Sequence, residues 1–206
     1  MPHPEQPQIY LVTPPDIDLA QFPDRLAAVL DAHEIACLRL ALAGHDEDQI
    51  TRAADACREI THARDVALVI ESHMMLVTRL GLDGVHLPDG PRHVRTARKN
   101  LGADAIIGSF CGTSRHDGIT AGEAGADYIS FGPAGHSDLG HGLQAERELF
   151  EWWSQMIELP VVAEGALDAA RIEELAPVTD FFGIGPEIWG HDDPAAALDA
   201  LLVALR

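Results

Sequence analysis

The stretch ALVIESHMMLVTRLGLDGVHL, residues 67–87, contains the pattern that decides the fold. It opens with a short apolar run, Ala67–Glu71, and closes after a longer interval on a second apolar run, Gly84–Leu87. Short runs that are almost entirely apolar are typical of strands buried on both faces, as in parallel sheets. We therefore expect a repeating unit of a strand, a helix and a parallel strand.

The same unit recurs along the chain. Eight runs are predicted to be strands: Gln8–Thr13, Ile35–Leu40, Ala67–Glu71, Gly84–Leu87, Ala105–Ser109, Tyr128–Gly132, Pro160–Ala163 and Asp180–Ile184. Alternating strands and helices imply parallel pairing with right-handed crossovers. Eight such units in 206 residues predict an α/β fold, a single (β/α)8 TIM barrel domain over residues 1–206. The alternative is a doubly wound open sheet, which usually has fewer strands; no Gly-x-Gly-x-x-Gly follows the first strand here.

The intervals between the strands show helical periodicity and capping residues. Asp46 and Gln49 are spaced like a capping box ahead of the apolar stripe within Ile50–Ile60. Asp168 and Asp193 are placed to cap two later helices. These signals agree with the strand–helix alternation.

Composition and charge exclude several classes of partner. The formal net charge is −19 and no basic stripe exists, which argues against nucleic acid and anionic membrane surfaces. No apolar run approaches the roughly 18 residues that a membrane span needs. The segment Met1–Gln6 has neither the basic nor the apolar region of a signal peptide, and three cysteines without a Cys-x-x-Cys favour a reducing compartment. We expect a cytoplasmic protein that binds a small molecule.

Polar side chains and glycines gather where the predicted strands end, which is where the loops of a TIM barrel form the active site. The candidate site residues found there are Arg39, Glu71, His86, Ser109, His136, Ser137, Glu164, Gly165, Gly185 and Glu187. The loop after the sixth strand runs on through Gly142 and is rich in glycine, so we expect it to act as a mobile lid.

Several of these segments carry a family pattern. LDGVHL at Leu82–Leu87 and GADYISFGP at Gly125–Pro133 are fairly specific together, and PVVA at Pro160–Ala163 follows at the expected spacing. Over nearly its whole length the chain resembles the thiamine phosphate synthase and thiazole tautomerase family. The resemblance implies a TIM barrel and a transferase of thiamine biosynthesis. The synthases of this family join an aminopyrimidine diphosphate to a thiazole phosphate and expel pyrophosphate held by Mg²⁺.

The resemblance also implies roles for the candidate residues. As catalytic residues, Arg39 would hold pyrophosphate, Glu71 would replace a metal carboxylate and Ser137 would contact the leaving group. The residues that we assign to ligand binding are His86, Ser109, His136, Glu164, Gly165 and Gly185.

The sequence departs from the family pattern at positions that handle anions. The second strand keeps only Arg39 of Gln-Leu-Arg-x-Lys, the lid lysine is missing near Ser137, and the Ile-Gly-Gly loop reads Glu164–Ala166. A carboxylate near a phosphate, such as Glu164 or Glu187, weakens phosphate binding by on the order of 1–4 kcal/mol at an effective dielectric near 20. We therefore expect a remodelled synthase site with little or no coupling activity. We also expect the last two loops to bind phosphate poorly unless these carboxylates turn away.

The metal carboxylates of the family change as well. Its Asn-Asp after the third strand reads Glu71-Ser72, and its second aspartate is lost where Pro91 stands. Imidazoles at the same rim make Glu71, His86 and His136 a candidate ligand set, for Mg²⁺ by resemblance and for Zn²⁺ by residue type.

Other interpretations stay open at this point. Arg39 is as well placed to pair with Glu71 as to bind an anion, and His86 on a buried strand often completes a core hydrogen bond. Glu71 and Glu164 are also placed to cap helices or to bond loop amides. The chain is alternatively a tautomerase or a metal-assisted hydrolase with a histidine base, or a non-catalytic binding protein. In the last case the exposed Trp152/Trp153 helix would be the interface. A homodimer is a separate possibility, to which the sequence assigns no surface.

Overall fold

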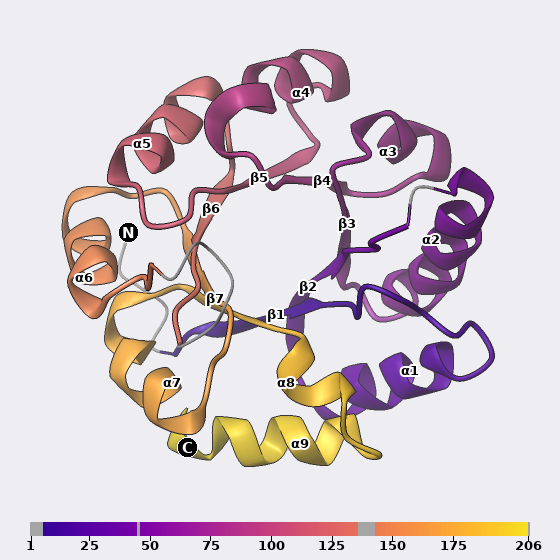
Figure 1. Ribbon diagram of the computed structural model, residues 1–206. Coiled ribbons are helices and arrows are strands. Elements are labelled where there is room, and N and C mark those ends of the chain that lie inside the picture. Colours follow the sequence, from indigo (N-terminus) through magenta and orange to yellow (C-terminus); the bar gives the residue numbers. More distant parts are fainter. Residues whose placement is uncertain (1–5, 45, 136–142, 206) are drawn as a thin grey trace.

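The chain folds into a closed barrel of eight parallel strands (Figure 1). The computed structural model describes residues 6–44, 46–135 and 143–205. The strands are β1 (Gln8–Val12), β2 (Ile35–Leu40), β3 (Ala67–Glu71), β4 (Gly84–Leu87), β5 (Ile106–Phe110), β6 (Tyr128–Phe131), β7 (Val161–Glu164) and β8 (Phe181–Ile184). Each pairs in parallel with the next, and β8 pairs with β1. The predicted TIM barrel is confirmed, and every predicted strand matches the structure to within one residue at each end.

Helices surround the barrel as an outer ring (Figure 1). They are α1 (Phe22–Ala32), α2 (Glu47–His62), α3 (Met74–Leu80), α4 (Val94–Leu101), α5 (Arg115–Ala124), α6 (Arg147–Met156), α7 (Ala169–Leu175), α8 (Pro186–Trp189) and α9 (Pro194–Leu201). Short 3₁₀ segments cover Gly90–His93, Ala176–Val178 and Leu202–Leu205. None of the helices in these described ranges is both long and apolar enough to cross a bilayer.

Three aspartates begin helices as the sequence predicts. Asp46 Oδ1 accepts from Gln49 N at 3.0 Å, and Asp168 Oδ1 accepts from Arg171 N at 2.7 Å. Asp193 caps α9 in the same way. Each bond satisfies an amide that the first helical turn leaves without a partner. These caps set where the loops after the strands end.

The interior of the barrel is layered. Cys37, Val69, Tyr128 and Val162 belong to an inner apolar cluster, separate from the larger core between strands and helices. Because side chains alternate between faces with a period of two, the next inward positions lie one layer closer to the strand ends. Those positions, in the same four strands, are Arg39, Glu71, Ser130 and Glu164. The mouth of the barrel is therefore polar above an apolar floor.

The tryptophan pair of α6 does not form an exposed interface. Trp153 is completely buried, with its ring 5.1 Å from Phe131 and its Nε1 donating to Leu159 O at 2.8 Å. Trp152 is half-buried, and the Arg115 guanidinium lies 4.6 Å from its ring centroid. The expectation of an exposed pair was wrong, because the face of α6 that bears Trp153 packs onto β6.

Candidate functional site

A cavity of about 290 Å³ opens at the carboxyl ends of the strands. Its lining residues come from strands and loops around the barrel: Arg39, Glu71, His86, Pro88, Phe110, Gly132, Pro133, Glu164 and Gly165. This volume lies near the lower end of the range for small-molecule pockets, roughly 300–1,000 Å³. The described part of the mouth is therefore suited to a ligand of about one heterocycle.

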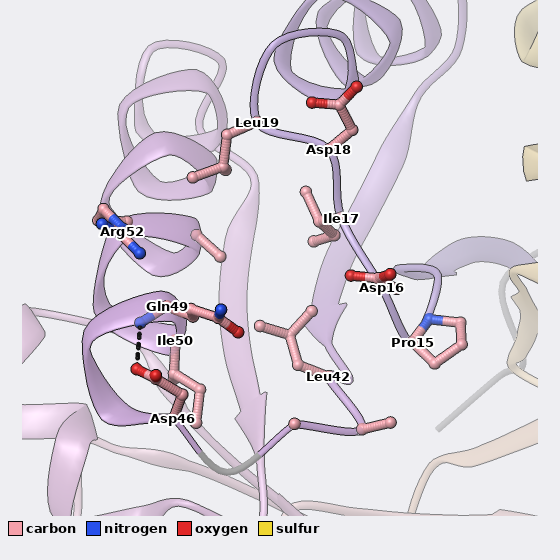
Figure 2. A pocket seen from close by; sticks show the side chains of 13 residues that line it. Pro15, Asp16, Ile17, Asp18, Leu19, Leu42, Asp46, Gln49, Ile50 and Arg52 are labelled. Atoms are coloured by element: carbon pink, nitrogen blue, oxygen red, sulfur yellow. Dashed lines mark hydrogen bonds between the residues drawn. The ribbon is translucent and has the colours of Figure 1, made fainter.

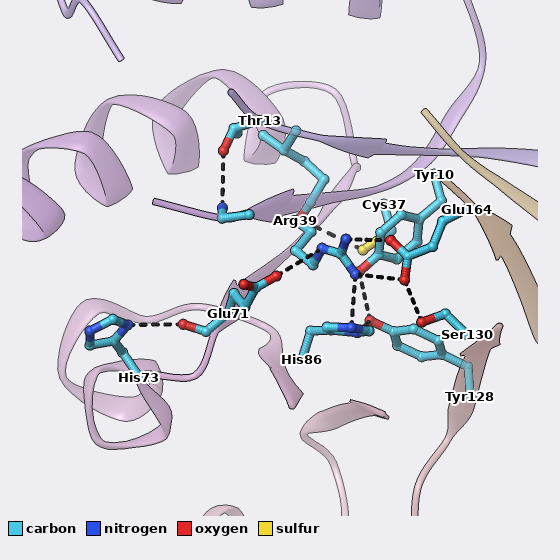
Figure 3. A network of polar contacts seen from close by, with 12 residues as sticks. Tyr10, Thr13, Cys37, Arg39, Glu71, His73, His86, Tyr128, Ser130 and Glu164 are labelled. Carbon is cyan, nitrogen blue, oxygen red and sulfur yellow. Dashed lines mark hydrogen bonds and ion pairs between the residues drawn. The ribbon is translucent and has the colours of Figure 1, made fainter. Parts of the chain in front are cut away.

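The dominant interaction in this cavity joins Arg39 of β2 to Glu164 of β7 (Figure 3). Arg39 Nη2 donates to Glu164 Oε2 at 2.5 Å, and Nη1 donates to Oε1 at 3.3 Å. Both side chains are buried. Burial alone would raise the pKa of Glu164, but the charge and hydrogen bonds of Arg39 outweigh it and lower the pKa to about 2. Glu164 is therefore ionised, and it neutralises the arginine.

Two further features of the strands hold Glu164 in this position. Ser130 Oγ of β6 donates to Glu164 Oε1 at 2.5 Å. On the other side, Gly183 of β8 pairs with Glu164, and a Cβ at residue 183 would lie 2.8 Å from the Glu164 Cβ. Strand β6 thus gives Glu164 a hydrogen bond, and the glycine at residue 183 of β8 leaves room for the Glu164 side chain.

His86 of β4 lies beneath the arginine as a neutral imidazole. Arg39 Nη1 lies 2.8 Å from His86 Nε2, and an arginine can only donate, so Nε2 accepts. Nδ1 then carries the proton and donates to Tyr128 Oη at 3.0 Å, and Tyr10 Oη follows 2.6 Å beyond. Burial, reinforced by the Arg39 charge, lowers the pKa of His86 well below its usual value. The alternative of a core hydrogen bond for His86 is thus confirmed.

Glu71 of β3 is the carboxylate that is more open to the cavity. Its Oε2 lies 3.4 Å from Arg39 Nε, an ion pair that the sequence analysis considered. Arg39 Nε makes no hydrogen bond of good geometry with any of the described residues. Partial burial raises the pKa of Glu71, although Arg39 opposes this effect. Among the described side chains of the mouth, Glu71 is therefore the carboxylate whose charge Arg39 compensates least directly, since both Arg39 Nη atoms bond to Glu164.

A second carboxylate contact lies at the rim, between the loops after β7 and β8. Glu187 Oε2 accepts from Gly185 N at 2.8 Å, and Glu187 Oε1 accepts from Leu167 N at 3.1 Å. From the sequence, Glu187 is expected only as a charge near a phosphate. In the structure this carboxylate binds backbone amides of both loops.

The remaining predicted site residues have different outcomes. Gly165 lines the cavity, whereas Ser109 is fully buried behind it with its hydroxyl 3.5 Å from Cys111 Sγ. His136 and Ser137 lie outside the described residues. Sequence reasoning missed Ser130, Tyr128 and Tyr10. The sequence did contain a sign of two of them. Tyr128 and Ser130 are two residues apart on one strand, so their side chains are expected on the same face.

The described residues do not fit the Mg²⁺ that the family resemblance implies. No group of three or more His, Cys, Asp or Glu side chains within the described ranges is arranged to hold a metal ion. Glu164 gives its oxygens to Arg39 and Ser130, and His86 Nε2 accepts from Arg39. Among the described residues, these side chains are bonded to one another and are not arranged as metal ligands.

A second hollow of about 600 Å³ lies to one side of the mouth, between the loop after β1 and helix α2 (Figure 2). Asp16, Asp18, Gln49 and Arg52 surround an apolar floor that includes Leu42. Its lining includes none of the residues of the Arg39–Glu164 network. The mouth is the stronger candidate, since perturbed titratable groups from several strands converge there.

Comparison with known proteins gives a consistent result. The family model described as thiamine monophosphate synthase matches residues 9–181. A thiamine-phosphate synthase of Rhodospirillum centenum is 39% identical, over 93% of this chain and 94% of that protein. One of Erythrobacter litoralis is 37% identical over 92% and 91% of the two chains. The structure of a thiamine phosphate pyrophosphorylase from Pyrococcus furiosus has a TM-score of 0.83 at 18% identity and covers 96% of this chain and 95% of its own, a likeness of fold.

Proposed function

The chain belongs to the thiamine monophosphate synthase family, and from this premise we propose that it is a remodelled member. Its cavity binds a thiamine-related heterocycle, and it joins aminopyrimidine diphosphate to thiazole phosphate only slowly or not at all. The observation that carries this proposal is the buried pair between Arg39 and Glu164.

The pair matters because a diphosphate needs cationic groups where its charge develops. Polyanionic leaving groups are stabilised by arginine, lysine or metal ions. Arg39 already has a carboxylate at 2.5 Å, so a diphosphate would have to displace Glu164 or bind beside it. Either arrangement leaves a carboxylate close to the incoming phosphates, which disfavours binding.

Two other cationic side chains, which could also bind a diphosphate, lie elsewhere. Lys99 is the only lysine of the whole chain, and it is exposed on α4. Arg171 of α7 donates to the carbonyls of Ala134 and Ala145 and pairs with Glu174. Neither side chain lines the cavity.

A coupling assay tests the proposal. Purified protein is mixed with aminopyrimidine diphosphate, thiazole phosphate and Mg²⁺, and thiamine phosphate is measured by thiochrome fluorescence. We expect turnover far below the roughly 1 s⁻¹ at the low end of typical enzymes. Turnover at or above that value would overturn the remodelled-site proposal.

A variant that restores the family residue at position 164 tests whether Glu164 is what prevents a diphosphate from binding. Glu164→Ile returns the isoleucine of the family loop and frees the guanidinium of Arg39. We expect pyrophosphate, used as the probe, to raise the melting temperature of this variant and to leave that of the wild type unchanged. The exposed Glu173→Gln on α7 removes the same charge outside the cavity and is the matched control. An equal response of all three proteins would show that Glu164 does not block the anion.

A further inference from the structure

We propose that Tyr128 is a positioning residue of the mouth, which acts on Arg39 through His86. Its hydroxyl holds the His86 ring in the orientation in which Nε2 accepts a hydrogen bond from the guanidinium. This inference goes beyond the proposed function, because it concerns how the charged group of the mouth is held in place, whichever ligand binds there.

The first step is the row of residues that brings the two side chains together. Gly108 of β5 is the strand partner of His86 on one side and of Tyr128 on the other. A Cβ at residue 108 would lie 2.1 Å from Cζ and 2.2 Å from Oη of Tyr128, so the phenol needs a glycine there. The glycine lets the phenol of β6 reach across β5 to the imidazole of β4, and the two rings stack with their centroids 5.7 Å apart.

The second step is that both ring nitrogens of His86 are bonded (Figure 3). Nδ1 donates to Tyr128 Oη at 3.0 Å, and Nε2 accepts from Arg39 Nη1 at 2.8 Å. A half-turn of the ring about the Cβ–Cγ bond would put carbon atoms where the two nitrogens lie, so both bonds would be lost together. The hydroxyl therefore fixes the same ring orientation that the guanidinium requires.

The third step concerns the surroundings of this hydroxyl. Tyr128 and Tyr10 belong to the inner apolar cluster below the mouth, and His86 is buried above them. Within the described ranges, His86 Nδ1 has Tyr128 Oη as its hydrogen-bond partner and no other. A buried N–H without a partner is costly. Removal of the hydroxyl therefore favours the tautomer with the proton on Nε2, which cannot accept from Arg39.

The fourth step links His86 to the direction of the guanidinium. Arg39 Nη1 is closer to His86 Nε2, at 2.8 Å, than to Glu164 Oε1, at 3.3 Å. Arg39 Nε makes no hydrogen bond with the described residues that would hold the group from the other side. The imidazole is thus the nearer partner of Nη1, and the guanidinium should turn in the cavity when Nε2 no longer accepts.

Tyr10 of β1 provides a matched comparison in the same layer. Its hydroxyl is also buried and lies 2.6 Å from Tyr128 Oη, but it is not bonded to His86. Loss of either hydroxyl removes one buried hydrogen bond between the two phenols. Only the loss at Tyr128 also removes the acceptor of His86 Nδ1, so a positioning role predicts different effects of the two changes on His86.

Nitrogen NMR of protein labelled with ¹⁵N-histidine and ¹⁵N-arginine tests the inference. Two-bond and three-bond correlations between ring protons and nitrogens distinguish the two neutral tautomers, and the His86→Gln protein identifies the His86 signals. We expect the Nδ1–H tautomer in the wild type and in Tyr10→Phe, and a shift toward the Nε2–H tautomer in Tyr128→Phe. Exchange of the Arg39 guanidinium protons with water should become about ten-fold faster or more in Tyr128→Phe alone, as for the loss of one hydrogen bond by a charged group.

Three outcomes would overturn the inference. One is an Nε2–H tautomer in the wild type, and another is an unchanged Nδ1–H tautomer in Tyr128→Phe. The third is an equal change in Tyr10→Phe and Tyr128→Phe, which would mean that any buried hydroxyl of this layer has the same effect. Circular dichroism checks that each variant is folded.

A second measurement keeps the hydroxyl and applies if Tyr128→Phe does not fold. The chain has only two tyrosines, so 3-fluorotyrosine incorporated into the Tyr10→Phe protein labels Tyr128 alone. Fluorine draws electron density from the phenol oxygen and weakens it as an acceptor. We expect the His86 Nδ1 signal to shift on labelling, and an unmoved signal would overturn the inference.

Discussion

Glu164 and Glu187 stand near the ends of neighbouring strands, yet they are held by different groups. Glu164 lies inside the mouth, where it bonds a buried guanidinium and a buried hydroxyl. Glu187 lies at the half-buried rim, where it bonds two backbone amides. The interior position pairs Glu164 with a buried charge, so that loss of the carboxylate would leave that charge uncompensated. The rim position joins Glu187 to the backbone of two loops at a half-buried site, where no buried charge depends on it.

The largest expected effect is a loss in the free energy of unfolding when the ion pair inside the mouth is broken. Glu164→Gln leaves the buried Arg39 without its counter-charge, and breaking a buried pair costs about 3–5 kcal/mol. Urea denaturation should show this loss in the free energy of unfolding. Replacing both partners, in Arg39→Met with Glu164→Leu, should recover most of it, because two apolar side chains need no compensation. A loss below about 1 kcal/mol would mean that the pair is solvated like a surface ion pair.

The pH dependence of the wild type should reveal the same pair. The pKa of Glu164 is lowered from 4.5 to about 2 in the folded state. The stabilisation is therefore complete above pH 4.5 and is lost as the pH falls from there toward 2, by up to about 3 kcal/mol. Unfolding curves measured across this window should fall more steeply for the wild type than for the Arg39→Met/Glu164→Leu protein. Parallel curves would contradict a low pKa for Glu164.

The rim should show the smallest effect. Glu187→Ala removes two hydrogen bonds at a position that water can reach, so we expect a loss of about 1 kcal/mol in the free energy of unfolding. The same urea titration measures it, with Glu173→Gln as the control for charge. A loss as large as that of Glu164→Gln would place Glu187 among the residues that hold the barrel together, and the contrast between the two carboxylates would fail.

Most of the fold could be predicted because its signals are local. The short apolar runs and the capping aspartates Asp46, Asp168 and Asp193 each act within a few residues. The Trp152/Trp153 pair shows the limit of such reasoning. Helical spacing placed both residues on α6, but which face of the helix packs on β6 depends on the assembled barrel.

Part of the candidate site was also visible in the sequence. Arg39, Glu71, His86, Glu164 and Gly165 each lie within one residue of the end of a strand, and parallel strands bring their carboxyl ends to one edge. The partners were not predictable, since Arg39 and Glu164 are 125 residues apart in the chain. Ser130 was missed although it is the penultimate residue of its strand, as Arg39 and His86 are of theirs, and it alternates in phase with Tyr128.

The sequence by itself determined the strand–helix alternation, the family and the residues at the strand ends, because hydrophobic periodicity and capping are properties of short segments. Only the tertiary structure decided what each charge does. Closure of the barrel through β8 and β1 brings β2 within reach of β7, which commits Arg39 to Glu164. The turn after β8 brings Glu187 onto the amides of two loops. A charge acts through the distance to its neighbours and through its burial, and both are set when the chain closes on itself.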